Sequence, residues 1–261
     1  MKIYIFADME GISGISGSEF VSSSGRLHPE GRRYYTADIN ACAEGCVQAG
    51  ADRVLARDGH AAGNYALWDE LHPKVELIQG AGGGRRLPGV EEYDGLILLG
   101  YHAMAGTRNA LLEHTYSSGR FQNVWLNGRP VGETGIDAGI AGEQGIPTIL
   151  VTGDDRVCRE AEEWVPGVVT CQVKTSLACQ GARLLPREEA HDLIRRAAAE
   201  AVGKIGDIAP VRVEKPVTMR LEMIERGAMP NPFTRQDVKI VDGRMFEVTG
   251  DSVERVFLSM V

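Results

Sequence analysis

The chain of 261 residues contains no apolar run that reaches the roughly 20 residues of a membrane-spanning helix. Basic residues are also in the minority, with 28 Lys and Arg against 36 Asp and Glu and a net charge of −8. This deficit argues against nucleic acid and against an anionic membrane surface, because both are bound by clustered positive charge. We therefore expect neither a nucleic acid nor a membrane among the partners of this protein.

Cysteine is scarce: the chain has five, an odd number, and no two have the CxxC spacing. This argues against a disulfide framework and against a zinc site made of thiolates. The N-terminal segment carries one Lys and then meets Asp8 and Glu10, without the long apolar stretch of a secretory signal. Together these features predict a reduced, cytoplasmic protein.

The sequence motifs of two common catalytic classes are missing. No GxSxG occurs, so the sequence does not support a hydrolase with a nucleophile elbow, although Ser117 and Ser118 are adjacent. No GxxxxGK[ST] phosphate-binding loop occurs either. The glycine-rich segment 80–86 lacks the full GxGxxG pattern, and we interpret it as a flexible loop rather than a phosphate cradle.

Alternating strands and helices dominate the first two-thirds of the chain. Short apolar runs predict buried strands, helical periodicity predicts the segments between them, and residues 11–25, rich in Gly and Ser, are expected to be loop. The predicted strands are residues 3–6, 53–56, 75–78, 95–100, 148–151 and 168–173, with helices at 31–50 and 133–145 and a hairpin at 124–131. This order is typical of a doubly wound α/β fold.

The pattern changes near Pro186. An amphipathic helix is expected at residues 187–205, and half-exposed strands, a hairpin and a closing helix at 211–213, 217–224, 238–248 and 251–260. We therefore predict a three-layer αβα fold with a mostly parallel central sheet, in a catalytic domain of residues 1–185. A smaller α+β subdomain, residues 186–261, is expected to follow it.

Three of the predicted strands end in side chains that bind metals. Asp8 and Glu10 follow the first strand, His60 the second, and His102 the strand at 95–100. The carboxyl ends of parallel strands lie along one edge of a sheet, so these side chains should meet there. Glu133, which opens a helix after the first hairpin, is a further candidate carboxylate.

Mixed carboxylate and imidazole ligands suit Zn²⁺, Mn²⁺, Co²⁺ or Fe²⁺ better than Mg²⁺ or Ca²⁺. One Asp can bridge two ions, and two ions about 3.5–4 Å apart can share a water and lower its pKa. A single His or Asp after a strand is more often a hydrogen-bonding loop residue. The joint pattern at three strand ends is what favours a metal site.

The polar segment 113–118 contains His114, a candidate for proton transfer because imidazole can exchange protons at working pH. A hydrogen-bonding loop histidine is an equally good interpretation of that residue. The remaining histidines lie beside Pro or on an exposed helix face, where surface roles are expected: His28, His72 and His191.

Five segments, in order along essentially the whole chain, resemble the motifs of the D-aminopeptidase family of metallopeptidases, peptidase family M55. They are Asp8-x-Glu10-Gly11, Asp58-Gly-His60, Gly100-Tyr-His102-Ala-Met-Ala-Gly106, Glu113-His114-Thr and Gly132-Glu133-Thr-Gly135. The resemblance implies two zinc ions bridged by Asp8, with Glu10 and His102 on one ion and His60 and Glu133 on the other. It also implies that His114 is the catalytic histidine.

One departure from the family is visible two residues before Asp8, where members often have Ser and this chain has Phe6. This difference should remove no ligand, but it is expected to change the hydrogen bonding around Asp8.

The resemblance implies a di-zinc aminopeptidase that removes N-terminal amino acids, D-amino acids by analogy, from short peptides and amino-acid amides through a metal-bound hydroxide. It further implies a homo-oligomer, a decameric ring. Two other interpretations of the same residues stay open: a metal-dependent amidohydrolase acting on cell-wall fragments, and a non-catalytic, metal-stabilised module that binds peptides.

Overall fold

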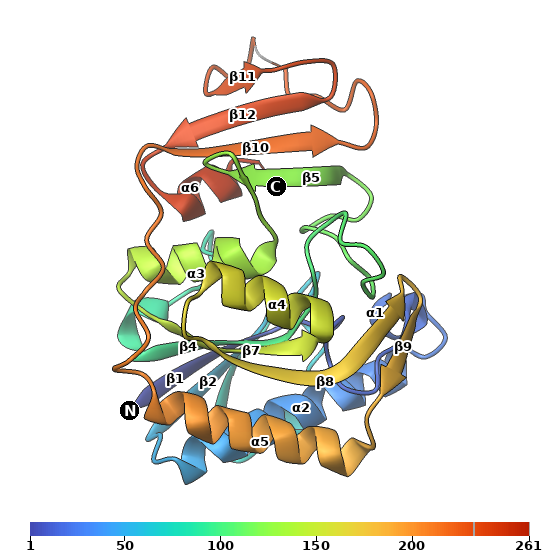
Figure 1. Cartoon of the computed structure of the whole chain (residues 1–261), viewed down its shortest axis with the longest axis vertical. Coiled ribbons are helices and arrows are strands. Elements are labelled where there is room, and N and C mark those ends of the chain that lie inside the picture. Colours follow the sequence, from blue (N-terminus) through green and yellow to red (C-terminus); the bar gives the residue numbers. More distant parts are fainter. Residues whose placement is uncertain (232, 261) are drawn as a thin grey trace.

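Two β-sheets organise the chain in the computed structural model, which describes residues 1–231 and 233–260 (Figure 1). The larger sheet has seven strands in the order β3-β2-β1-β4-β7-β8-β9, all parallel except β9. Its strands are β1 (Lys2–Ala7), β2 (Arg53–Asp58), β3 (Val75–Ile78), β4 (Gly95–Tyr101), β7 (Thr148–Asp154), β8 (Val169–Ala178) and β9 (Gly181–Leu184).

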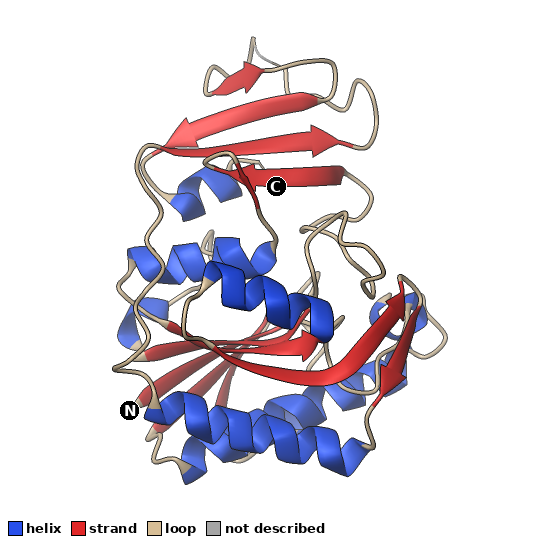
Figure 2. Ribbon diagram, viewed as in Figure 1, coloured by secondary structure: helices blue, strands red, loops and turns tan. Residues whose placement is uncertain are grey.

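Helices cover both faces of this sheet, as Figure 2 shows. α2 (His28–Gln48) and α5 (Arg187–Gly203) pack together on one face, while α3 (Glu133–Glu143) and α4 (Asp155–Trp164) cover the other. β1 and β4 are buried almost throughout, because helices exclude water from both of their faces. The three-layer αβα arrangement with a mostly parallel sheet is therefore confirmed.

The smaller sheet is antiparallel, with the order β11-β12-β10-β5-β6. It contains β5 (Phe121–Leu126), β6 (Arg129–Pro130), β10 (Val217–Met223), β11 (Val238–Ile240) and β12 (Met245–Gly250), and α6 (Val253–Leu258) lies between it and α3. β5 and β6 come from the first half of the chain, and α5 belongs to the larger sheet. The predicted division at residue 186 is therefore not the division between the two sheets.

Three local differences from the expected elements have physical causes. Residues 211–213 form no strand, because they pack against a helix and not beside another strand. Their contact with α3 is so close that a Cβ on Gly142 would lie 1.9 Å from the Val211 carbonyl oxygen. A short helix, α1 (Ser18–Val21), interrupts the expected loop at 11–25. β9 was not predicted, since its residues are at most half-buried and lack an apolar pattern.

The register of the larger sheet decides where the site lies. Ala7, the last residue of β1, pairs with Asp58 of β2 on one side and with Leu99 of β4 on the other. The segments that follow these three strands therefore leave the sheet side by side, at its carboxyl edge. In the ranges that the structure describes, no helix combines the length and the apolar character that crossing a bilayer would demand.

Candidate metal centre

Asp8 lies at the centre of the predicted ligand set. Its Oδ1 is 3.0 Å from His60 Nδ1, and its Oδ2 is 3.4 Å from His102 Nε2. The two imidazoles come from the ends of β2 and β4, the two strands that flank β1 in the sheet. As their places at the strand ends predicted, these three side chains meet at the carboxyl edge of the sheet.

The remaining two carboxylates stand on opposite sides of Asp8. Glu10 Oε2 is 3.1 Å from His60 Nδ1, whereas Glu133 Oε1 is 3.3 Å from His102 Nε2. The structure therefore groups Glu10 with His60 and Glu133 with His102. The resemblance implied a different grouping, Glu10 with His102 and His60 with Glu133, and which ion each residue binds stays a prediction.

Close backbone packing places these side chains. Gly59 directly precedes His60. A Cβ on Gly59 would lie 2.2 Å from the Phe6 ring, so the turn after β2 needs glycine at this position. Asp58 fixes the rest of that loop, because its Oδ2 accepts hydrogen bonds from the backbone N–H groups of Tyr65 and Ala66. The acidic residue of the Asp58-Gly-His60 motif therefore positions the loop and does not face the metal centre.

All three histidines of the centre are oriented in the same way. One nitrogen of each ring is hydrogen-bonded to a backbone carbonyl oxygen. The distances are 3.2 Å between His60 Nε2 and the Val21 oxygen, 3.1 Å between His102 Nδ1 and the Ala103 oxygen, and 2.8 Å between His114 Nδ1 and the Leu112 oxygen. If the ring N–H is the donor in each case, the other nitrogen presents its lone pair to the carboxylates. Histidine ligands of metals are commonly held by such bonds.

The charge of the centre also fits a cation. Three carboxylates, those of Asp8, Glu10 and Glu133, are buried together, which is costly without compensating positive charge. Among the described residues, Glu10 Oε2 and His102 Nε2 are buried atoms whose contacts with facing ionisable groups, at 3.1–3.4 Å, lack the geometry of a hydrogen bond. These unsatisfied ligand atoms and the mixed carboxylate and imidazole set suit zinc or a similar transition metal.

Burial and ion pairing shift the pKa values within the cluster in opposite directions. Burial opposes ionisation of Asp8, but pairing with the imidazoles of His102 and His60 holds the pKa of its carboxyl well below the usual value. Burial likewise opposes the charging of His60 and His102, and the facing carboxylates nevertheless raise the pKa of both imidazoles well above the ordinary value. The cluster therefore attracts positive charge, whether protons or metal ions.

His114 stands beside this centre. Its ring stacks on His102 with 4.1 Å between centroids, and its Nε2 lies 3.8 Å from Glu133 Oε1. It is only partly buried, so it lies between the ligands and the open pocket. This position is compatible with proton transfer to a bound substrate and also with metal ligation.

Arg86 is a residue of the site that the sequence argument missed. It ends the glycine-rich segment that was interpreted as a flexible loop, and its guanidinium bonds both carboxylate oxygens of Asp137 at 3.0 Å and lies 3.3 Å from Glu133 Oε2. It also stacks over Phe6, 4.3 Å from the ring centre. Phe6 therefore contacts the guanidinium that pairs with Glu133, and its expected effect on the hydrogen bonding around Asp8 stays a prediction.

Lys174, in the middle of β8, is a second missed residue. It is almost fully buried, and its Nζ donates hydrogen bonds to the carbonyl oxygens of Glu10, Ile12 and Ile15, at 2.7, 2.8 and 2.9 Å. Burial lowers the pKa of Lys174 to about 7. This single ammonium group holds the loop that carries Glu10 against the sheet, and no sequence pattern distinguishes it from a surface lysine.

We expect Lys174→Met to destabilise the protein, because three buried carbonyl groups lose their donor. A loss of about 3 kcal/mol in the free energy of unfolding would lower Tm by roughly 6–12 °C. Zinc content should fall as well, since the Glu10 loop is released. Thermal unfolding and elemental analysis check both effects, with Lys74→Met at an exposed position as the control. An unchanged Tm and zinc content would contradict the role given to Lys174.

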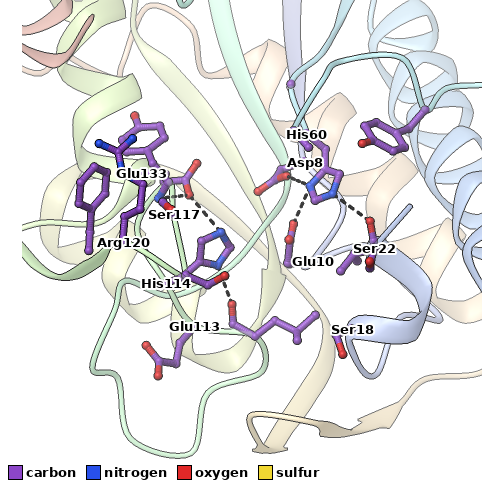
Figure 3. Close-up of a pocket in the computed structure, with 18 of the residues that line it drawn as sticks. Asp8, Glu10, Ser18, Ser22, His60, Glu113, His114, Ser117, Arg120 and Glu133 are labelled. Carbon is purple, nitrogen blue, oxygen red and sulfur yellow. Dashed lines mark hydrogen bonds and ion pairs between the residues drawn. The ribbon is translucent and has the colours of Figure 1, made fainter. Parts of the chain in front are cut away.

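A cavity of about 780 Å³ opens over the ligands. Figure 3 shows Asp8, Glu10 and His60 on one side of it, near Ser18 and Ser22 of the α1 region, with His114, Glu133 and Arg120 on the other. The volume lies in the range of small-molecule sites. The cavity is therefore large enough to admit a small molecule to the ligand cluster.

Comparison with known proteins assigns the chain to a family. The profile of peptidase M55, described as D-aminopeptidase, matches residues 1–261. The chain belongs to the D-aminopeptidase family. It is a metallo-aminopeptidase, a hydrolase of peptide bonds, as the five motifs implied.

Two relatives show how far the similarity of this family member extends. The D-aminopeptidase of Bacillus subtilis (strain 168) is 33% identical over 229 residues, which are 87% of this chain and 83% of that protein. The solved structure of the Zn-dependent D-aminopeptidase DppA from Bacillus subtilis, a self-compartmentalizing protease, superposes with a TM-score of 0.93 at 29% identity. That match covers 100% of this chain and 95% of the solved one.

Proposed function

We propose that this D-aminopeptidase family member is a di-zinc enzyme that removes N-terminal D-amino acids from short peptides and amino-acid amides. One observation carries the proposal: the two carboxylate oxygens of Asp8 each face a different imidazole, at 3.0 and 3.4 Å. This is the arrangement that a bridging carboxylate needs. In this proposal Glu10 and His60 would hold one ion, His102 and Glu133 would hold the other, and Asp8 would contact both.

Zinc bound there would supply Lewis acidity toward the scissile carbonyl and lower the pKa of water. The protein's own contribution is orientation and proton transfer. Hydrogen bonding of the three imidazoles to backbone carbonyls fixes their directions, and Arg86 and the N–H of Tyr116 hold Glu133 through its two oxygens. His114 Nε2 is the atom that we assign to proton transfer with the leaving amine.

The wider setting of the enzyme is also a proposal. The neighbour DppA is a self-compartmentalizing protease, and the chain matches it over its whole length, which supports a homo-oligomer with enclosed active sites. A decameric ring is the form that we propose, as the family resemblance implies. The cysteines of the described structure are all free, in keeping with the cytoplasmic location that we propose. Short peptides are the proposed substrates.

The function is tested by comparing D-Ala-D-Ala with L-Ala-L-Ala, and both with a phosphate ester. We expect kcat/KM for the D-dipeptide to exceed that for the L-dipeptide by at least about a hundredfold, because a shaped pocket rejects the wrong configuration. Removal of metal by a chelator should abolish turnover, and added zinc should restore it. Full activity in metal-free buffer, or a preference for the L-dipeptide, would contradict the proposal.

A further inference from the structure

The walls of the substrate cavity carry two guanidinium groups with different surroundings. Arg86 is already ion-paired with Asp137 and Glu133, so its guanidinium is not free to bind a substrate. Arg120 is exposed and lines both this cavity and a smaller one beside Met229 and Met260. Over residues 1–231 and 233–260, no carboxylate lies within ion-pairing distance of Arg120. It is therefore the cation of this wall that is available to an anionic ligand.

The backbone of Arg120 is well anchored, although its side chain is open. Its N–H donates to the Ser117 carbonyl at 3.2 Å, and its own carbonyl accepts at 2.9 Å from the N–H of Ile224, the residue directly after β10. The guanidinium lies 5.1 Å from the centre of the Phe121 ring, a cation–π contact that limits its motion. The backbone bonds and this contact together restrict where the guanidinium can lie.

The turn that carries Arg120 is connected to the metal centre. It begins directly after Tyr116, whose backbone N–H donates to Glu133 Oε1 at 2.8 Å. Figure 3 shows Arg120 on the same side of the cavity as Glu133 and His114, across from Asp8 and Glu10. A ligand that touches both the metal centre and Arg120 would therefore extend along this wall.

A free dipeptide has a matching distribution of charge. Its scissile bond must lie at the metal centre, and its C-terminal carboxylate follows one residue further on, roughly 3.5 Å away along an extended chain. Guanidinium groups bind carboxylates through paired, charge-assisted hydrogen bonds. A C-terminal amide has no charge to offer and cannot form the same ion pair.

We propose that Arg120 binds the C-terminal carboxylate of the peptide and so makes the enzyme select short peptides with a free C-terminus. This inference rests on the proposed aminopeptidase function and adds to it the group that recognises the far end of the substrate. Arg120 is a specificity residue in this account and takes no part in bond cleavage.

The test compares D-Ala-D-Ala with its C-terminal amide, which has the same scissile bond and lacks only the carboxylate. For the unaltered enzyme we expect kcat/KM to be about 10–100-fold higher for the free dipeptide, the range that one charged hydrogen-bonding pair supplies. In Arg120→Gln this ratio should fall to near one, through a rise of KM for the free dipeptide. Arg120→Lys should restore part of the ratio. Arg108→Gln, at an exposed position outside the cavity lining, is the matched control and should keep the ratio.

The possible failures can be told apart. If the unaltered enzyme cleaves both substrates equally well, or if Arg120→Gln keeps the original ratio, the role of Arg120 is overturned while the proposed function stands. The same holds if Arg120→Gln lowers kcat for both substrates alike. If the unaltered, zinc-loaded enzyme cleaves neither substrate, the proposed function itself is wrong, and the role of Arg120 fails with it.

Discussion

Replacing Asp8 by asparagine is expected to remove both zinc ions and to abolish peptide hydrolysis. Asn keeps the shape of the side chain but loses its charge and replaces one of the two oxygens that face His60 and His102. We expect kcat/KM to fall at least roughly a thousandfold. The metal ions are expected to stabilise the transition state by several kcal/mol, and each loss of about 1.4 kcal/mol lowers the rate tenfold. Elemental analysis and turnover of D-Ala-D-Ala measure the two effects.

Variants on either side of Asp8 make this prediction more specific. His60→Ala and Glu133→Ala should each lose one ion and the activity, since the distances group these residues in different halves of the centre. Asp69→Asn, at an exposed position, should lose neither. Two tightly bound ions in Asp8→Asn would show that Asp8 does not bridge them.

Replacing His114 by glutamine is expected to lower kcat and to leave the metal in place. Loss of a positioned group that transfers protons costs roughly 10²–10⁴ in rate. His114 lies against His102 and Glu133 on the open side of the centre, so substrate can reach its Nε2. KM should change little, because the ring is assigned to the reaction step and not to ground-state binding.

The zinc content of His114→Gln decides between the two roles that its position allows. His102, His114 and Glu133 lie close enough together to hold one ion among them. Two ions per chain in the inactive variant would support proton transfer, whereas a fall to one ion would make His114 a ligand. His72→Gln, a histidine paired with Glu44 away from the cavity, is the control.

The gathering of Asp8, His60 and His102 was predictable because parallel topology is itself predictable. Buried apolar runs separated by helical segments indicate a doubly wound sheet, and the ends of adjacent strands in such a sheet must meet. The sequence did not contain the order of the strands, nor which carboxylate faces which imidazole. Which ion Glu10 shares with which histidine therefore stays a prediction.

Arg86 and Lys174 could not be predicted for a different reason. Each acts through a contact with residues 47 or more positions away, and neither belongs to a periodic pattern. Arg86 ends a segment whose glycines indicate flexibility, yet Asp137 immobilises it. Lys174 is a lysine in a strand, a residue type that is mostly exposed, and only the three carbonyls around it explain its burial.

The second sheet shows the same limit at the level of the fold. The hairpin of β5 and β6 was expected, with its Asn127-Gly128 turn, but its partner strand β10 lies some 90 residues further on. Local patterns determine which segments are strands, whereas tertiary packing decides which sheet they join. The boundary near residue 186 was placed by a change of pattern, and the sheets divide elsewhere.

The most direct test of this account is a count of the ions that the unaltered protein binds. Metal-free protein is titrated with zinc, freed of unbound metal, and analysed for zinc per chain, together with turnover of D-Ala-D-Ala at each step. The account predicts saturation at two zinc ions per chain, with full activity reached at two. Saturation at one ion, or full activity without bound metal, would contradict a centre bridged by Asp8.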